Sequence, residues 1–233
     1  YDALPVPEIL GIAEYVLGAD DEYVYLLVLP SDHVLKPQDV FAEAVARARA
    51  CAESGRIVTF GITPDAPETG FGYIRRGGAL PSGGYAVARF VEKPDLARAE
   101  AMLADGGYLW NSGMFVWKTS SILANIEKLM PDIYEGLVRI EAAVGTPDYE
   151  RVLETEYHAF RSESIDFGVM EKAENIYTLP GSFGWDDVGN WLAMERINKT
   201  NDYGNYIEGD VITVNTQRSI ICGQKKLIAA VGV

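Results

Sequence analysis

The sequence is poor in cysteine and histidine, and the few that it has are scattered. It contains two cysteines and two histidines, and neither Cys51 nor Cys222 belongs to a CxxC motif or to a His/Cys cluster. We therefore expect no structural zinc site. Both cysteines lie among apolar neighbours, which favours two buried thiols in a reducing compartment over a disulfide and predicts the cytoplasm.

Long hydrophobic runs and basic stretches are also missing. The longest apolar run, Tyr23–Leu29, is too short to cross a bilayer, and no charged-then-apolar signal segment opens the chain. Acidic residues outnumber basic ones by 34 to 20, a net charge of −14, and no Lys/Arg stripe could replace phosphate counterions. We therefore expect neither a membrane partner nor a nucleic-acid partner.

What the sequence does contain is typical of a folded α/β protein, with apolar runs alternating with amphipathic stretches. Tyr23–Leu29 predicts a strand buried on both faces of a largely parallel sheet. Apolar residues at helical spacing follow from Asp39 to Ser54, with Gly55 at the C-terminal cap position. A second strand, Ile57–Ile62, completes a predicted βαβ unit.

The rest of the chain divides into a mixed part and an all-β part. We predict strands at 73–75, 85–92, 110–117 and 176–179, and helices at 95–105, 120–130, 133–143, 149–155 and 165–173. After Tyr203, three short strands at 210–215, 218–222 and 227–231 follow one another without helices. This change predicts two domains, 1–204 and 205–233.

Asp32 is the first candidate for chemistry. It follows the Tyr23–Leu29 strand in the segment Leu29-Pro30-Ser31-Asp32-His33, where Pro30 ends the strand. Ligands of open α/β sheets bind at the carboxyl ends of strands, so Asp32 is placed to contact one. The alternative is that Asp32 only forms a local Asx turn.

A second acidic segment runs from Gly184 to Gly189. Its adjacent carboxylates, Asp186 and Asp187, repel each other unless a cation or hydrogen-bond donors neutralise them. Asp32 and one of this pair would supply the hard oxygen ligands that Mg²⁺ prefers, with substrate phosphates at other positions. A solvated Asp-Asp turn is the alternative.

Three further segments have the chemistry of a sugar-phosphate site. Glu92 and Lys93 end a predicted strand, where a carboxylate can accept from sugar hydroxyls and an ammonium can meet a phosphate. Asn111-Ser112-Gly113 offers an amide and a glycine among aromatic residues, which suits a polyol, although a strand with a turn explains it equally. In Glu68–Tyr73, two glycines permit close backbone contact with a ligand.

Taken in their order along the chain, these segments resemble the bacterial mannose-1-phosphate guanylyltransferases (GDP-mannose pyrophosphorylases) of the sugar-nucleotidyltransferase superfamily. The motifs that carry the resemblance are LPSDH (29–33), PETGFGYI (67–74), FVEKP (90–94), WNSGMF (110–115), SIDFGVMEK (164–172) and WDDVGNW (185–191). The resemblance covers nearly all of the chain. It implies a Rossmann-like, glycosyltransferase-A-like mixed sheet and the Mg²⁺-dependent reaction of GTP with mannose 1-phosphate to give GDP-mannose and pyrophosphate.

The resemblance also implies a role for each motif residue. Asp32 and Asp187 match the metal ligands, and Lys93 matches the phosphate contact, so these three are the predicted catalytic residues. Predicted substrate-binding residues are Gly72 and Tyr73 in a loop over the sugar, Glu92 and Asn111 at its hydroxyls, and Gly113 and Lys93 beside them. For Asp166, a helix N-terminal cap is an equally good explanation.

The chain departs from this family at both ends. The family's opening strand and its phosphate-binding loop rich in Gly, Arg and Lys are not found, so we expect a catalytic domain truncated at its N-terminus. Residues 205–233 match only the start of the family's C-terminal β-helix. The Tyr23–Leu29 strand would then have an unpaired apolar edge, which predicts either a contact with a second copy, as in a homodimer, or a protein whose missing residues are present but disordered.

Two alternative functions stay open. One is nucleotidyl transfer with a different nucleotide or hexose, because the base-selecting segment is not in the chain. The other is a non-catalytic sugar-nucleotide-binding or regulatory subunit, or an inactive fragment.

Overall fold

The computed structural model describes residues 25–81 and 83–233. Within these ranges the chain forms two compact units, one of residues 25–30 and 39–182 and the other of residues 31–38 and 183–233. The predicted domain boundary at residue 204 therefore falls inside the second unit. Among the helices of the described residues, none has the length and apolar character needed to cross a membrane.

The first unit is built on a mixed six-stranded sheet with the strand order β1-β5-β2-β6-β4-β3. The strands are β1 (Tyr25–Val28), β2 (Ile57–Ile62), β3 (Tyr73–Ala79), β4 (Tyr85–Val91), β5 (Tyr108–Lys118) and β6 (Ile176–Gly181). Only β2 and β6 pair in parallel; every other pair is antiparallel. The first residues of the long strand β5 pair with β3, and its later residues pair with β2 and β1.

Strand β1 differs from its prediction in two ways. It pairs antiparallel with β5, and Leu26 and Val28 are buried while Leu27 between them is exposed, so one face of the strand is covered and not both. An apolar run cannot distinguish these two cases from sequence alone. The first two residues of the predicted strand lie outside the described residues.

The predicted βαβ unit is present in split form, with a third strand between its two parallel strands. Strands β1 and β2 both pair antiparallel with β5, so they run parallel to each other with β5 inserted between them. Among the strands of residues 25–81 and 83–233, β5 is the sole partner of β1, which leaves β1 at the edge of the sheet. The contact of this edge with a second copy stays a prediction.

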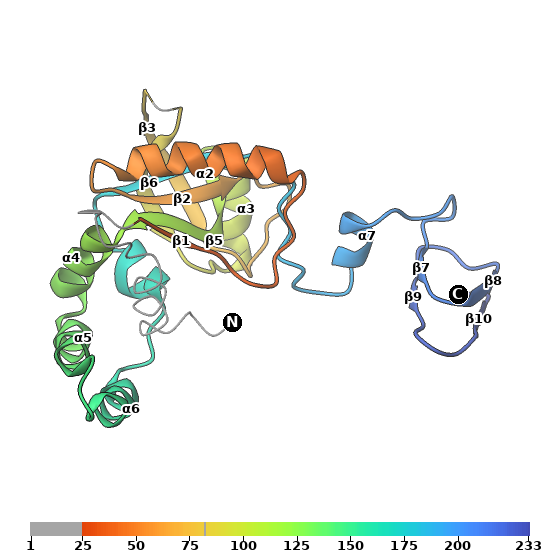
Figure 1. Cartoon of the computed structure of the whole chain (residues 1–233). Helices are drawn as coiled ribbons and strands as arrows, with labels where there is room; N and C mark the ends of the chain where they lie inside the picture. Colours follow the sequence, from red (N-terminus) through yellow and green to blue (C-terminus); the bar gives the residue numbers. More distant parts are fainter. Residues whose placement is uncertain (1–24, 82) are drawn as a thin grey trace. The chain divides into compact units, whose positions relative to one another are not determined.

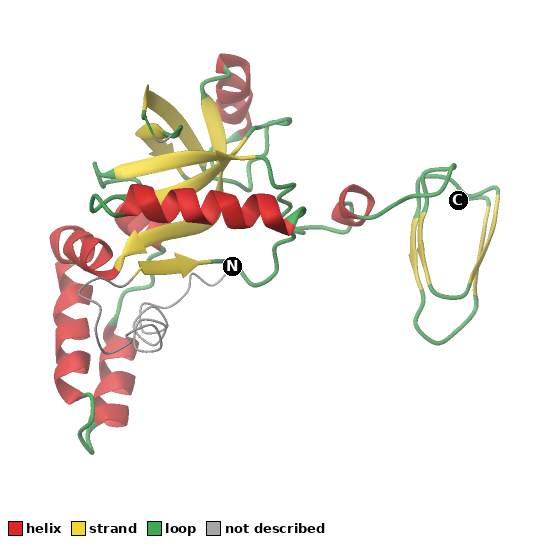
Figure 2. Cartoon of the chain, turned by 45° about the horizontal axis from the view of Figure 1, so that its top comes forward, coloured by secondary structure: helices red, strands yellow, loops and turns green. Residues whose placement is uncertain are grey.

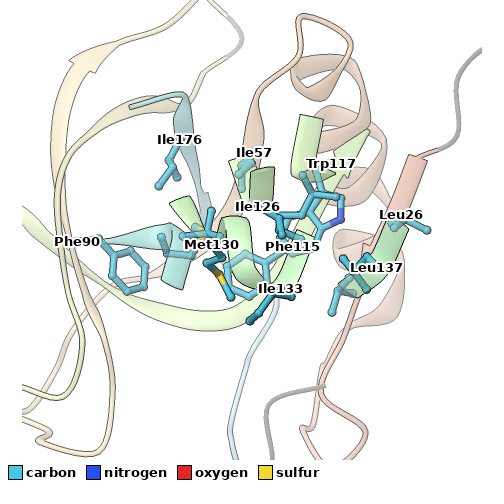
Figure 3. Packing of buried hydrophobic residues seen from close by; sticks show 14 of the residues in the cluster. Leu26, Ile57, Phe90, Phe115, Trp117, Ile126, Met130, Ile133, Leu137 and Ile176 are labelled. Carbon is cyan, nitrogen blue, oxygen red and sulfur yellow. The ribbon is translucent and has the colours of Figure 1, made fainter. Parts of the chain in front are cut away.

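Helices lie on both faces of the sheet (Figures 1 and 2). On one face, α2 (Gln38–Ala52) packs Phe41 against Phe60 of β2. On the other face, Ile57 of the same strand joins the main hydrophobic core, in which Met130 and Ile133 lie beside the β5 ring of Phe115 (Figure 3). The helices on this second face are α4 (Thr119–Leu129), α5 (Pro131–Ala143) and α6 (Tyr149–Ala159).

Two helical segments show how local sequence sets helix bounds. Helix α3 (Leu96–Asp105) begins where Asp95 accepts from the N–H of Arg98 and ends at Gly106, whose φ is 68°, as the capping residues predict. By contrast, the predicted helix 165–173 is only a five-residue π-helix, η1 (Asp166–Met170). Asp166 does not cap it, because no side-chain cap hydrogen bond is formed there.

The second unit contains α7 (Ala193–Ile197) and four short strands: β7 (Tyr206–Glu208), β8 (Val211–Val214), β9 (Ile220–Cys222) and β10 (Ile228–Val231). β7 pairs with β9 and β8 pairs with β10, both in parallel. The last three strands are as predicted. Cys222 at the end of β9 is exposed, so the prediction of two buried thiols is correct for Cys51 and wrong for Cys222. The three-residue β7 and the short α7 were not predicted.

Candidate functional site

Strand pairing in the first unit brings together three residues that the sequence separates widely. Tyr73 of β3 pairs with Val91 of β4, which places Gly72 beside Glu92 at the end of these strands. The N–H of Asn111 in β5 donates to the Gly72 carbonyl at 2.7 Å. Gly72, Glu92 and Asn111, all predicted to bind substrate, therefore form one cluster.

Gly72 is a glycine because the Glu92 carboxylate occupies the space of a side chain. A Cβ at position 72 would lie 2.4 Å from Oε2 of Glu92 and 3.2 Å from Cβ of Asn111. Close approach, and not backbone conformation, thus requires glycine here. Oε2 of Glu92 is buried and has no hydrogen-bond partner within the described part of the chain.

Tyr73 begins a strand, as the prediction of a strand at 73–75 requires, but it does not lie in the loop over the sugar that the family resemblance implies. It is the first residue of β3 and not part of a loop, it pairs with Val91 and Trp110, and its side chain is fully buried. The alternation of side chains along a strand turns Tyr73 into the sheet, whereas Gly72 remains at the cluster.

A β-bulge in β5 orients the amide of Asn111. The β2–β5 register changes between Thr59 and Gly61, so that the extra residues of β5, including Gly113 with φ 71°, bulge outward. Oδ1 of Asn111 accepts from Oγ1 of Thr59 at 3.0 Å and from the N–H of Gly113 at 3.3 Å. With both lone pairs of Oδ1 used, the side chain can offer a ligand only an N–H donor. Gly113, also predicted to bind substrate, thus lies beside Asn111, and its substrate contact stays a prediction.

Two acidic residues at the two ends of the π-helix η1 join this cluster. Nδ2 of Asn111 donates to Oδ1 of Asp166 at 3.2 Å. The N–H of Glu92 donates to Oε1 of Glu171 at 3.0 Å. Neither Thr59 nor Glu171 was singled out from the sequence. Glu171 belongs to the quoted motif SIDFGVMEK, which could have indicated it, whereas no motif contains Thr59.

Lys93 is the cation of the cluster. Its Nζ lies 3.6 Å from Oε1 of Glu92, and its side chain is 53% exposed while that of Glu92 is 8% exposed. Lys93 has a φ of 43°, a left-handed conformation that is uncommon for a residue with a Cβ and turns the chain sharply after β4. The ammonium group is therefore held near the carboxylate and remains accessible to an anion.

The electrostatics of the cluster favour neutral or hydrogen-bonded carboxyl groups. Burial, reinforced by the charge of Asp166, raises the pKa of Glu92 to about 7, although Lys93 acts in the opposite direction. Burial also raises the pKa of Asp166, against the effects of Lys93 and the Asn111 hydrogen bond. A ligand with several hydroxyl groups would give these carboxyl groups the hydrogen bonds that burial denies them.

The other predicted residues lie in the second unit, where Val34 and Asp186 form an isolated antiparallel bridge. Their reciprocal N–H···O hydrogen bonds measure 2.9 and 3.1 Å and join the segment of Asp32 to that of Asp187. Nε1 of Trp185 donates to Nδ1 of His33 at 3.0 Å. Burial lowers the pKa of His33, and the carboxylates of Asp32, Asp187 and Asp186 all act against this shift. Asp32 and Asp187 thus lie near the same imidazole.

The two adjacent aspartates of the second unit have different surroundings. Asp186 accepts two hydrogen bonds from Arg196, at 2.6 and 3.0 Å, and one from the N–H of Val188. Burial tends to raise the pKa of Asp186, but the Arg196 hydrogen bonds, the Val188 N–H and the charge of Arg196 together hold this pKa below its usual range. Asp187 instead accepts from the N–H of Gly189 at 3.2 Å. Val188, between them and the glycine, has the strained φ of 50°.

These carboxylates match the donor chemistry of Mg²⁺ without forming a complete protein cage. No group of three or more His, Cys, Asp or Glu side chains that could hold a metal ion occurs among residues 25–81 and 83–233. Mg²⁺ is usually bound by one or two carboxylates together with water and phosphate oxygens, so Asp32 and Asp187 suffice for such a site. Their metal-binding role stays a prediction.

Comparison with known families gives one match over most of the chain. The family model described as nucleotidyl transferase matches residues 9–202.

Curated proteins with similar sequences include mannose-1-phosphate guanylyltransferases and xanthan biosynthesis proteins. The chain is 42% identical over 215 residues to a mannose-1-phosphate guanylyltransferase of Salmonella montevideo and 42% identical over 214 residues to one of Escherichia coli. It is 43% identical over 208 residues to the xanthan biosynthesis protein XanB of Xanthomonas campestris. These alignments cover 89% of this chain but only 44–45% of each relative, so the chain spans about half the length of the curated relatives it matches.

Two solved structures have a similar fold. A crystal structure described as a mannose-1-phosphate geranyltransferase from Thermus thermophilus superposes with a TM-score of 0.86 at 33% identity, covering 100% of this chain and 66% of that one. A structure described as a mannose-6-phosphate isomerase from Helicobacter pylori gives a TM-score of 0.62 at 32% identity over 72% of this chain and 66% of that one.

Proposed function

The chain belongs to the nucleotidyl transferase family, and from this premise we propose that it carries the sugar-phosphate and metal sites of an enzyme that makes GDP-mannose from GTP and mannose 1-phosphate. The observation that carries the proposal is the cluster of Gly72, Glu92 and Asn111 beside the accessible Lys93. Its buried carboxyl and amide groups suit a hexose, and its ammonium suits the adjoining phosphate.

The proposed reaction needs little covalent help from the protein. A phosphate oxygen of mannose 1-phosphate attacks the α-phosphorus of GTP in line, a new P–O bond forms, and the bond between the α-phosphorus and the bridging oxygen breaks to release pyrophosphate. The attacking oxygen is already ionised near neutral pH, so no general base is required. Catalysis is therefore positioning and charge neutralisation.

The residues of the first unit divide these tasks. Asn111 donates an N–H to a sugar hydroxyl, and Glu92 exchanges hydrogen bonds with hydroxyl groups and fixes the orientation of the ring. Lys93 offsets the charge of the sugar phosphate as the two anionic substrates approach. In the second unit, Asp32 and Asp187 would hold Mg²⁺, which supplies further neutralisation of phosphate charge when bound.

The remaining parts of the proposal concern the whole molecule. The parallel pairing of β7 with β9 and of β8 with β10 supports the start of a β-helix in residues 205–233. A homodimer, a cytoplasmic location and the lack of nucleic-acid and membrane partners stay predictions.

The test is a direct assay on the full natural protein that contains this chain. With GTP and mannose 1-phosphate we expect GDP-mannose and pyrophosphate in equal amounts, and slower turnover when another nucleoside triphosphate or hexose 1-phosphate replaces either substrate. A preference for a different pair would assign the protein to another reaction of the family. Binding of GDP-mannose without turnover would support the non-catalytic alternative.

Asp187→Asn is the sharpest variant for this assay, because it removes the charge of a proposed metal ligand with little change in shape. We expect turnover to fall by at least ~10²-fold while the thermal unfolding curve stays close to that of the wild type. Asp186→Asn is the matched control: its partner is Arg196, so we expect a lower melting temperature and a much smaller loss of turnover. Near wild-type turnover of Asp187→Asn would refute the metal role.

A further inference from the structure

The short π-helix η1 contacts the cluster of Gly72, Glu92 and Asn111 at both of its ends. It contains five residues, Asp166–Met170, and the N–H of Glu171 donates to the carbonyl of Asp166 at 2.9 Å, five residues back. In an α-helix, residues five apart point in different directions. The wider π-turn brings their directions closer together, and the hydrogen bonds of Asp166 and Glu171 place both carboxylates against the cluster.

Each end of this turn holds a different member of the cluster. At the start, Oδ1 of Asp166 accepts from Nδ2 of Asn111 at 3.2 Å. At the end, Oε1 of Glu171 accepts from the backbone N–H of Glu92 at 3.0 Å. Asn111 and Glu92 are the two side chains to which the proposed function gives the sugar hydroxyls.

The turn itself is fixed by packing. Val169 and Met170 are buried in the main core, and Gly168 lies so close to Met130 that a Cβ at position 168 would come within 2.4 Å of its sulfur. The core therefore holds the turn in place from behind, while its two carboxylates face the cluster. π-turns of this kind are frequent at functional sites.

We propose that the turn η1 is a positioning device for the hexose pocket. Asp166 fixes the direction of the Asn111 amide, and Glu171 fixes the backbone at which the Glu92 side chain begins. Glu171 is thus a positioning residue that acts on the sugar through Glu92, by accepting a hydrogen bond and not by its charge. What the pocket binds rests on the proposed function; the positioning does not.

Glu171 allows a clean test because its side chain is exposed, so its replacement is compatible with folding. In Glu171→Ala the Glu92 N–H loses its acceptor, and we expect the KM for mannose 1-phosphate to rise about 5- to 10-fold while kcat changes less than about twofold. In Glu171→Gln the amide oxygen still accepts, so we expect KM within about twofold of the wild type. Glu174→Ala, an exposed acid three residues further on, is the matched control and should leave both constants unchanged.

A second measurement needs no substrate. The exchange of the Glu92 amide hydrogen with solvent, followed by NMR, should be about 5- to 10-fold faster in Glu171→Ala than in the wild type, and unchanged in Glu171→Gln and Glu174→Ala. If the wild type does not use mannose 1-phosphate, the proposed function fails, and the exchange rates still decide the positioning role. Equal exchange in all four proteins overturns the proposal. So does a Glu171→Gln variant as impaired as Glu171→Ala, because charge would then be the cause.

Discussion

At the scale of single residues, the candidate site depends on the missing side chain of Gly72 and on the buried carboxyl group of Glu92. Gly72 has no unusual backbone conformation, yet a Cβ there would meet Oε2 of Glu92 at 2.4 Å. That oxygen is buried without a partner in the described part of the chain, and burial raises the pKa of Glu92. The Glu92 side chain is therefore both the steric neighbour of position 72 and the group whose pKa burial raises.

Gly72→Ala should destabilise the protein by about 1–3 kcal/mol, because the added methyl group overpacks against the Glu92 carboxylate. Gly70→Ala is the control: a Cβ at position 70 has no neighbour within 4 Å, so its effect should stay within about 0.5 kcal/mol. Urea unfolding measures both. In a Glu92→Ala background, the Gly72→Ala substitution should cost less, since the carboxylate is gone. An unchanged cost there would refute the steric explanation.

The raised pKa of Glu92 predicts a pH dependence of stability. Between its unfolded value near 4.5 and its folded value of about 7, the folded protein binds more protons at this site than the unfolded chain does. The contribution of Glu92 to stability therefore falls as pH rises through this window. Glu92→Gln removes the titrating group, so its free energy of unfolding relative to the wild type should increase from about pH 5 to about pH 8. Parallel stability curves would contradict the shift.

At the scale of elements, the bulge in β5 is the structural reason why Asn111 serves the site. The register change against β2 lets the chain leave the ladder for the residues around Gly113, and the Thr59 hydroxyl connects the two strands. Oγ1 of Thr59 lies 3.0 Å from Oδ1 of Asn111 and 3.1 Å from the carbonyl of Met114. Thr59 of β2 thus holds the side-chain amide of Asn111 in β5 in one orientation.

Thr59→Val should cost about 1–3 kcal/mol of stability, because it removes a buried hydroxyl and leaves its acceptors short of a donor. It should also raise the KM for mannose 1-phosphate, since the Asn111 amide is then less firmly oriented. Thr178→Val in β6 is the control. Thr178 is equally buried, but its hydroxyl has no hydrogen-bond partner in the described residues, so the substitution should be neutral or stabilising. Equal losses for both variants would contradict a specific role of Thr59.

At the scale of the whole molecule, β1 is at the edge of the first unit's sheet among the strands of residues 25–81 and 83–233, and Leu27 of this strand is 37% exposed. Such an edge presents unpaired backbone groups beside apolar side chains, which favours pairing with another chain. This is the structural basis for the expected homodimer.

Leu27→Lys should shift a dimer formed along β1 toward monomers, because a charge on an edge strand opposes pairing. Sedimentation measures the association over a range of protein concentrations. Leu96→Lys, which changes a 55% exposed leucine of α3, should leave the association unchanged. A wild-type protein that is monomeric at all concentrations would contradict the prediction.

Local sequence was enough to predict the ends of single elements. The predicted helix 95–105 agrees with α3, which Asp95 caps and Gly106 ends. Such a prediction succeeds because capping and apolar periodicity depend on neighbours along the chain. The residue types of Glu92, Lys93 and Asn111 also indicated a sugar-phosphate site, and their roles there stay predictions.

How distant segments meet became known only from the folded chain. Folding inserted β5 between β1 and β2, buried the Tyr73 side chain that the resemblance had implied at the sugar, and replaced a predicted helix with the π-turn that carries Asp166 and Glu171. Each of these outcomes depends on hydrogen bonds and packing between residues tens of positions apart, such as the pair Glu92–Glu171. Local sequence patterns carry no information about such contacts. The order of the strands and the meeting of distant side chains are therefore set only by the tertiary structure.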